Sequence, residues 1–183
     1  MRLKPLPEPP GSLSVLAEYQ RAVPLVPGSE DDCCARLRDR SGLADRDVAN
    51  DWLALLRALG LVEETPRGFR RTDADPTVER VRRGLREEVL FAPAAVDRLR
   101  TATPAEPVTA DDLFASIRES VPRHDRFRDP NWETTWRERS GRLLRWFALV
   151  DLATPVDPGR AAETGTHTDG AGRAYVAGDA VAE

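Results

Sequence analysis

Two segments of this 183-residue chain, 88 residues apart, end in almost the same order of side-chain types. Residues 55–63 read Leu-Leu-Arg-Ala-Leu-Gly-Leu-Val-Glu, and residues 143–151 read Leu-Leu-Arg-Trp-Phe-Ala-Leu-Val-Asp. Each segment combines an apolar helical stretch, a small residue, two branched apolar residues suited to a strand, and an acid. The repetition predicts two copies of one small unit, with Ala148 in the second copy replacing Gly60 of the first.

The first copy carries signals for two helices followed by a hairpin. Ser29 is a helix N-cap residue, and Ser41-Gly42 forms a short glycine-containing turn before a helix from Asp45 to Leu59. Residues 61–64 and 68–71 flank Pro66-Arg67, so they are expected to pair as a two-stranded ribbon.

The second copy follows the same order with longer connections. Thr109 is expected to cap a helix, residues 122–130 form a polar loop, and a long helix runs from Trp132 to Ala148. Leu149 to Ala153 is a strand candidate with Arg173 to Ala177 as its partner. Between them, residues 154–172 predict a long mobile wing tip, with a disordered tail as the alternative.

Residues 29–72 resemble the winged helix-turn-helix of archaeal and bacterial transcription regulators, and residues 109–177 resemble a second, more divergent copy. The resemblance implies a mainly α fold with small β-wings, built from two winged helix-turn-helix units in tandem. The expected division is an extended lead-in (1–11), a first unit (12–74), a helical connector with the second unit (75–177) and a flexible tail (178–183).

The composition is that of a folded, soluble protein with 40% hydrophobic and 32% charged residues. No apolar run is long enough to span a bilayer, so we expect a cytoplasmic protein with no membrane partner. Lys4 is the only lysine among 27 basic residues, a bias that a GC-rich genome explains more simply than function does. Because the net charge is −4, attraction to nucleic acid must come from local patches.

Signals for enzymatic chemistry are absent from the sequence. The two histidines, His124 and His167, have no nucleophile motif beside them, and no phosphate loop, dinucleotide fingerprint or zinc motif occurs. Cys33 and Cys34 are adjacent, which suits neither a disulfide between them nor a metal site, so we expect them on or beside a buried helix face. The sequence therefore predicts a protein that is not an enzyme and holds no cofactor or metal.

The long helix of the second copy is the main candidate for DNA recognition. In a helix-turn-helix the second helix enters the major groove, and arginine is the best donor to guanine edges and phosphates. The alternative is a solvated face with acid–arginine pairs four residues apart. Two of the tryptophans, Trp132 and Trp136, are expected in the core, and Trp146 is expected to be partly exposed. The candidate DNA-binding residues of this copy are Arg126, Arg128, Thr134, Arg137, Arg139, Arg142 and Arg145.

The first copy gives a weaker DNA signal. Its second helix offers Arg46 and Asn50 near the N-terminus, but three aspartates beside them oppose phosphate approach. Its ribbon adds Arg67, Arg70 and Arg71 as candidate phosphate contacts.

We therefore predict a double-stranded DNA-binding protein, in the role of a transcription regulator. Two alternatives stay open: a winged-helix subunit that docks on protein partners within a chromosome or transcription complex, and a DNA-recognition module of a defence system. The operator, an effector, the sign of regulation and the oligomeric state are not encoded in any pattern of the sequence.

Overall fold

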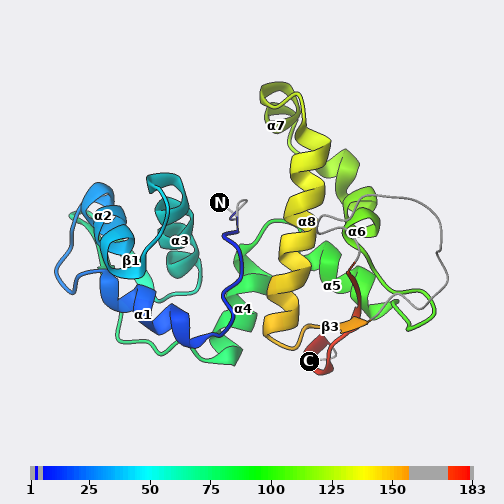
Figure 1. Cartoon of the computed structure of the whole chain (residues 1–183), viewed down its shortest axis with the longest axis horizontal. Helices are drawn as coiled ribbons and strands as arrows, with labels where there is room; N and C mark the ends of the chain where they lie inside the picture. Colours follow the sequence, from blue (N-terminus) through cyan, green and yellow to red (C-terminus); the bar gives the residue numbers. More distant parts are fainter. Residues whose placement is uncertain (1–2, 4–5, 157–172, 182–183) are drawn as a thin grey trace. The chain divides into compact units, whose positions relative to one another are not determined.

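The computed structural model describes residues 3, 6–156 and 173–181. The chain divides into two compact units, Met1–Leu90 and Phe91–Glu183, and each consists of helices with one small antiparallel hairpin (Figure 1). The predicted fold class, mainly α with two β-wings in tandem, is confirmed.

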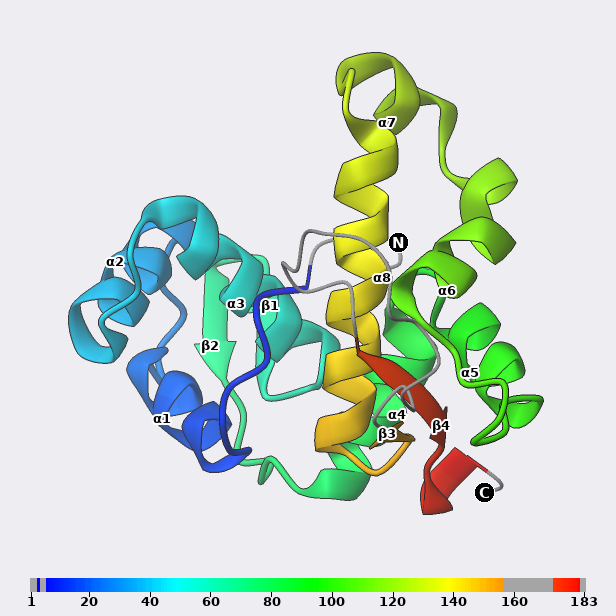
Figure 2. The same cartoon turned by 45° about the vertical axis from the view of Figure 1, so that its right-hand side comes forward.

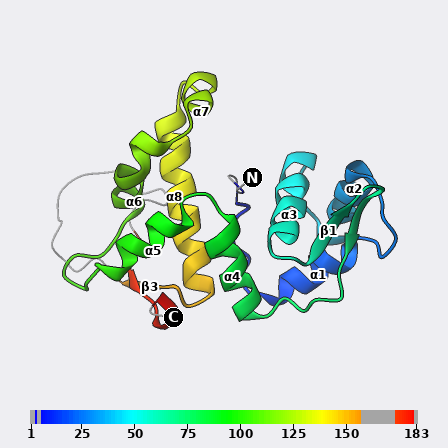
Figure 3. The ribbon, with the colours of Figure 1, turned by 180° about the vertical axis from the view of Figure 1, so that it is seen from behind.

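The first unit contains three helices, a hairpin and a further helix (Figure 3). The hairpin strands pair Val62 with Arg71, and an isolated bridge from Gly28 to Phe69 adds a third strand position beside the second strand. This is the helix–strand–helix–helix–hairpin order of a winged helix. The elements are α1 (Ser14–Ala22), α2 (Glu30–Ser41), α3 (Arg46–Ala58), β1 (Val62–Thr65), β2 (Gly68–Arg71) and α4 (Val78–Glu88).

Local signals explain where these helices begin and end. The Ser29 hydroxyl accepts a hydrogen bond from the backbone N–H of Asp32, which fixes the start of α2. Gly42 ends α2 in the left-handed conformation (φ 63°), and the Asp45 carboxylate then caps α3. The predicted turn and both helices are therefore confirmed, with α3 ending one residue earlier than expected.

The amino-terminal segment pairs with the end of α4. The backbone N–H of Leu3 donates to the carbonyl of Glu88 at 2.7 Å, and the N–H of Leu90 donates to the carbonyl of Leu3 at 2.8 Å. Gly84 of α4 is buried, and a Cβ there would lie only 2.7 Å from a methyl carbon of Leu59. These contacts place α4 in the first compact unit, whereas the division expected from the sequence begins the second domain at residue 75.

The second unit has the same order with additional short helices between its second and third main helices (Figure 2). Its hairpin pairs Ala153 with Ala177, and an isolated bridge from Val108 to Tyr175 again adds a third strand position. The elements are α5 (Ala92–Arg100), α6 (Ala110–Ile117), η1 (Arg118–Ser120), α7 (Arg123–Arg128), α8 (Trp132–Leu149), β3 (Ala153–Val156), β4 (Ala174–Ala177) and η2 (Asp179–Val181).

Two sequence-based boundaries in this unit were wrong. Residues 122–130, predicted to be a loop, contain the helix α7, which begins directly after Pro122. The predicted strand from Leu149 to Ala153 starts too early, because α8 continues to Leu149 and β3 begins at Ala153. The predicted wing tip comprises residues 154–172. Its residues 157–172 lie outside the described residues.

The two units repeat each other at a different register from the one that the sequence suggested. The hairpins start 91 residues apart, at Val62 and Ala153, and not 88. Gly60 and Asp151 are also 91 residues apart, and both break the helix with a positive φ, 68° and 60°. The counterpart of Gly60 is therefore Asp151 and not Ala148, which lies within α8.

A shift of three residues explains why the sequence match was misleading. Three residues turn a helix by about 300°, so an apolar face shifted by three positions largely overlaps itself. At the spacing of 91, six pairs of equivalent positions are buried in both units. Five pairs lie within α3 and α8, and the sixth directly follows these helices. They are Ala49 and Ser140, Trp52 and Leu143, Leu53 and Leu144, Leu55 and Trp146, Leu56 and Phe147, and Leu59 and Val150.

The register of 91 residues also bears on the burial of the tryptophans. Trp146 is completely buried, so the expectation that it is partly exposed was wrong. Its counterpart in the first unit is Leu55, which is also completely buried. Trp136 is buried as predicted, while Trp132 is only half-buried at the start of α8.

Candidate nucleic-acid interface

In each unit an exposed ion pair links the predicted recognition helix to the first helix of the helix-turn-helix. In the first unit the Arg46 guanidinium binds the Asp31 carboxylate, and in the second unit Arg137 Nε donates to Asp111 Oδ1 at 2.5 Å. Asp31 and Asp111 are each the second residue of their helix, α2 or α6. The pair joins the first helix of each helix-turn-helix to the second, so these two predicted DNA-binding arginines also have a structural partner.

A stripe of polar residues runs along α8 on the side opposite the buried Trp136. Thr134, Glu138, Arg142 and Arg145, which we call the α8 stripe, are spaced four, four and three residues apart. Thr134 and Glu138 are exposed, and the two arginines are half-buried. Three predicted DNA-binding residues thus share one face of the predicted recognition helix.

Two other predicted arginines of α8 lie beside that face and not on it. The Arg137 guanidinium lies 5.1 Å from the centre of the Phe114 ring, and that of Arg139 lies 4.7 Å from the centre of the Trp136 ring. Such cation–π contacts hold the arginine stems against the protein. Both side chains are half-buried, so they flank the α8 stripe from the sides of the helix.

The predicted residues of the α7 segment have different environments. Arg126 turns inward, where it donates to the backbone carbonyl of Val121 at 2.8 Å and lies 5.5 Å from the centre of the Trp132 ring. Arg128 is exposed. It borders a groove of about 320 Å³ that also includes Asp129 and Arg139.

A hydrogen-bonded carboxylate joins α7 to α8. The Thr135 hydroxyl donates to Asp129 Oδ2 at 2.6 Å, and the backbone N–H of Asn131 donates to Oδ1 at 2.8 Å. These hydrogen bonds, that of Thr135 first, hold the pKa of Asp129 below its usual value. Asp129 therefore stays ionised and holds the end of α7 against the first turn of α8.

The predicted DNA-binding residues of the first unit are less well placed to form a single DNA-binding surface. Asn50 is exposed on α3 and Arg67 is exposed at the hairpin turn. Arg70 Nε donates to Glu63 Oε1 at 2.6 Å across the hairpin, and Arg71 donates to the carbonyl of Arg21 at 3.1 Å. The wing arginines are thus partly engaged within the unit.

The two recognition helices differ in charge at equivalent positions. At the spacing of 91 residues, Asp51 of α3 corresponds to Arg142 of α8, and Ala54 corresponds to Arg145. Asp47 and Glu138 are acidic in both units. The same scaffold therefore presents an acidic and apolar stripe in the first unit and a more basic one in the second.

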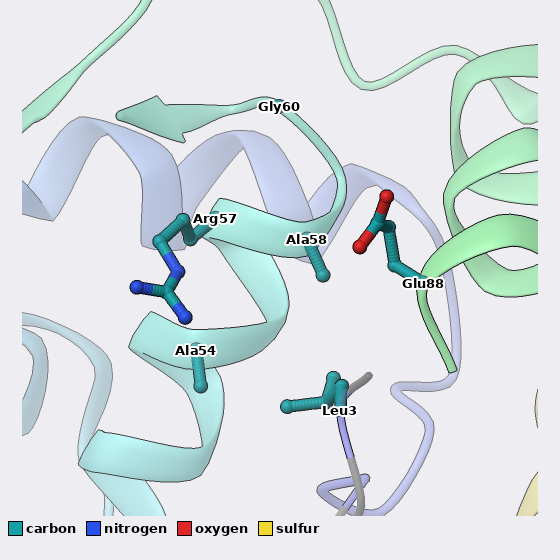
Figure 4. Close-up of a pocket in the computed structure, with 6 residues that line it drawn as sticks. All are labelled: Leu3, Ala54, Arg57, Ala58, Gly60 and Glu88. Atoms are coloured by element: carbon teal, nitrogen blue, oxygen red, sulfur yellow. The ribbon is translucent and has the colours of Figure 1, made fainter. Parts of the chain in front are cut away.

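A shallow groove of about 380 Å³ lies beside the end of α3 in the first unit (Figure 4). Leu3, Ala54 and Ala58 give it an apolar floor, and Glu88 lies at its side. Arg57, which also borders it, binds the Glu64 carboxylate. The groove combines one acid, one paired arginine and three apolar side chains, which identifies no particular ligand.

The cysteines are buried in α2, as expected from their position in the sequence. Cys33 and Cys34 are completely or almost completely buried and are not joined to each other. Burial, followed by the neighbouring Cys34 and Asp32, raises the pKa of the Cys33 thiol to about 11. A thiol with such a pKa is a poor nucleophile.

Within the described ranges, no group of three metal-ligating side chains occurs that could hold an ion.

Sequence reasoning missed the surface of α7. Phe127 is 86% exposed, and it lies among basic residues on a helix that was predicted to be a loop. The spacing of four between Arg123 and Phe127 and between His124 and Arg128 was the available signal, but six residues are too few for a reliable periodicity.

Comparison with known proteins identifies the family. Residues 1–167 match the model of the halobacterial double winged helix domain, so the chain belongs to that family. No curated protein and no solved structure matches the chain. In the part of the chain that the structure describes, none of the helices has both the length and the apolar character needed to cross a membrane.

Proposed function

We propose that this member of the double winged helix family binds double-stranded DNA through its second unit and acts in transcription control. In the proposed complex the α8 stripe enters the major groove. Winged units are variants of the helix-turn-helix, in which the second helix reads base edges. The observation that carries the proposal is the replacement of Asp51 and Ala54 in α3 by Arg142 and Arg145 at the equivalent positions of α8.

Arginine at these positions has the chemistry that the proposal needs. Arg142 and Arg145 are three residues apart on one face, so both guanidinium groups can approach the same groove, where arginine donates to guanine or to phosphate. Thr134 lies near the start of α8, the part of a recognition helix that reaches deepest. Arg137, Arg139 and Arg128 are proposed as flanking phosphate contacts, whereas Arg126 turns inward to the carbonyl of Val121 and is left out of the proposed contact.

The ion pair of Arg137 is compatible with this role. The side chains of Arg137 and Asp111 are 37% and 60% exposed. Pairs with this exposure are weak, and arginine exchanges such a partner for phosphate when DNA approaches. In the first unit, Arg46, Asn50 and the wing residues Arg67, Arg70 and Arg71 are proposed as secondary contacts.

Fluorescence polarisation with a random duplex, measured at about 50 and 200 mM salt, tests the proposal. The variant Arg142→Ala/Arg145→Ala should bind more weakly, and the negative slope of log K against log salt should become shallower by about 1.8, or 0.9 per lost phosphate contact. A control variant with the same change in charge is Arg83→Ala/Arg98→Ala, because both arginines are exposed on other helices. Equal affinities of the α8 variant and the control would refute the proposal.

Protein docking by the first unit is the second candidate function. Asp47 and Asp51, four residues apart, give α3 an acidic face, which repels phosphate and suits a basic protein surface. Under this alternative, Asp47→Lys should abolish a stable protein complex and leave DNA affinity unchanged. An increase in DNA affinity without loss of any complex would instead favour α3 as a surface that faces DNA.

A further inference from the structure

The outer face of α7 combines one exposed aromatic ring with basic side chains. Successive residues of a helix are about 100° apart, so Arg123, Phe127, His124 and Arg128 lie within about 140° of one another. Phe127 is 86% exposed, and the other three residues are also exposed. We call these four residues the α7 surface.

The inner face of α7 accounts for its attachment to the unit. Arg126 reaches the carbonyls of Val121 and Glu119, and it lies over the Trp132 ring. Asp125 is half-buried and lies 2.8 Å from the His124 ring nitrogen. Packing therefore uses the opposite side of the helix and gives no reason for a phenylalanine on the outside.

The basic residues around Phe127 indicate which kind of partner could bind the α7 surface. Arg123 and Phe127 are four residues apart, so their side chains are neighbours on the helix surface. Arg128 follows directly after the ring. A purely apolar partner would leave these guanidinium groups desolvated without acceptors, which is unfavourable. Phosphate oxygens beside stacked bases supply acceptors and a flat apolar face together.

We propose that the α7 surface is a second DNA contact, in which Arg123 and Arg128 bind backbone phosphates and Phe127 packs against a base step. This inference rests on the proposed function. It is supported by the place of α7, which adjoins the amino-terminal end of α8 (Figures 1 and 2). The Asp129–Thr135 hydrogen bond and the Arg126–Trp132 contact fix it there, so a DNA contact by α7 would hold the end of α8 in one orientation.

The aromatic and the basic parts of this contact should be separable by their dependence on salt. An apolar contact releases no counterions, whereas each phosphate contact contributes about 0.9 to the slope of log K against log salt. In fluorescence polarisation with the full chain and a random duplex, Phe127→Ala should weaken binding about 10-fold with an unchanged slope. Arg123→Ala/Arg128→Ala should make the negative slope shallower by about 1.8.

Two control variants match these changes. Val26→Ala removes another exposed apolar side chain (75% exposed), and Arg83→Ala/Arg98→Ala removes two exposed arginines from other helices. Both controls should bind as the wild type does. Phe127→Leu should recover part of the lost affinity, because an aliphatic wedge also separates bases. Thermal melting of Phe127→Ala should match the wild type, since the ring is exposed.

The results distinguish failure of this inference from failure of the proposed function. If the wild type binds DNA and the α8 variant is impaired, but both α7 variants bind normally, only the α7 contact is overturned. If the wild type binds no duplex at low salt, the proposed function and the α7 contact both fail. Loss of a protein complex in Phe127→Ala with unchanged DNA affinity would assign the α7 surface to a protein partner and overturn the inference.

Discussion

Substitution of Gly68 by alanine should unfold the wing of the first unit. Gly68 follows Pro66-Arg67, and proline cannot adopt the positive φ angles of the turns that hairpins prefer. Gly68 supplies a positive φ in place of the proline, at 118°, a conformation that alanine rarely adopts. A Cβ at this position would also lie 2.1 Å from the carbonyl oxygen of Gly28.

The size of the effect follows from this geometry. Cβ atoms essentially never approach closer than 3.0 Å, so relief of the overlap moves the two segments apart by about 0.9 Å. The hydrogen bond from the Phe69 N–H to the Gly28 carbonyl, now 2.8 Å, would stretch to about 3.7 Å and be lost. Loss of the reciprocal pair of hydrogen bonds and strain at φ together amount to about 3–5 kcal/mol.

Hydrogen exchange read by mass spectrometry tests this prediction region by region. In Gly68→Ala, peptides that cover residues 24–29 and 62–72 should exchange about two to three and a half orders of magnitude faster, because about 1.4 kcal/mol corresponds to a factor of ten. Peptides from the second hairpin should be unchanged. Gly11→Ala is the control, since Gly11 has no atom within 4 Å of an added Cβ. Wild-type exchange around Gly28 and Phe69 in Gly68→Ala would refute the reasoning.

Three further predictions concern buried groups. Trp146→Ala should lower the free energy of unfolding of the second unit by about 3–5 kcal/mol in urea denaturation, and Trp132→Ala, at a half-buried position, should lower it less. Gln20→Leu should destabilise the first unit by about 2–4 kcal/mol, because its amide donates to the carbonyls of Leu61, Thr72 and Ala74; an unchanged urea midpoint would contradict this. For Cys33 the folded pKa of about 11 lies above the ordinary thiol value of 9.0, so its contribution to stability is complete below pH 9 and is lost as pH rises towards 11. A thiol reagent at pH 8 should accordingly react with Cys33 only after denaturation, and rapid reaction of the folded protein would contradict the predicted burial.

Most of the fold could be predicted because its signals are local. Ser29, Gly42, Asp45 and Thr109 each mark a helix end by hydrogen-bonding chemistry that depends on only a few neighbouring residues. The turn chemistry of Pro66-Arg67 between two short segments likewise predicts a hairpin without tertiary information. These elements are where the sequence places them, within one or two residues.

The errors arose where two readings of a local pattern are nearly equivalent. The register of α8 was misjudged because a three-residue shift preserves most of an apolar face, and only the positive φ of Asp151 identifies the break. Trp146 was assigned to a partly exposed position because it lies off the apolar stripe of Trp132, Trp136, Leu143 and Phe147. The α7 helix was missed because it is six residues long, and its stability depends on Arg126 and Asp129, whose partners are visible only in three dimensions.

The arginines of the candidate site fall into two groups. Some have an equivalent arginine in the other unit, and others do not. The pairs Asp31–Arg46 and Asp111–Arg137 occur at equivalent positions in both units, so the helix-turn-helix itself is sufficient reason for those arginines. Arg142 and Arg145 differ, because the first unit builds the same helix with Asp51 and Ala54, so the scaffold does not dictate an arginine at either position. Positions that differ in charge between two copies of one scaffold are those that packing leaves undetermined, so a function specific to one copy must be sought there. For this reason, the α8 double variant is a sharper test of DNA binding than substitution of Arg137, whose loss would remove an ion pair within the unit as well as any contact with DNA.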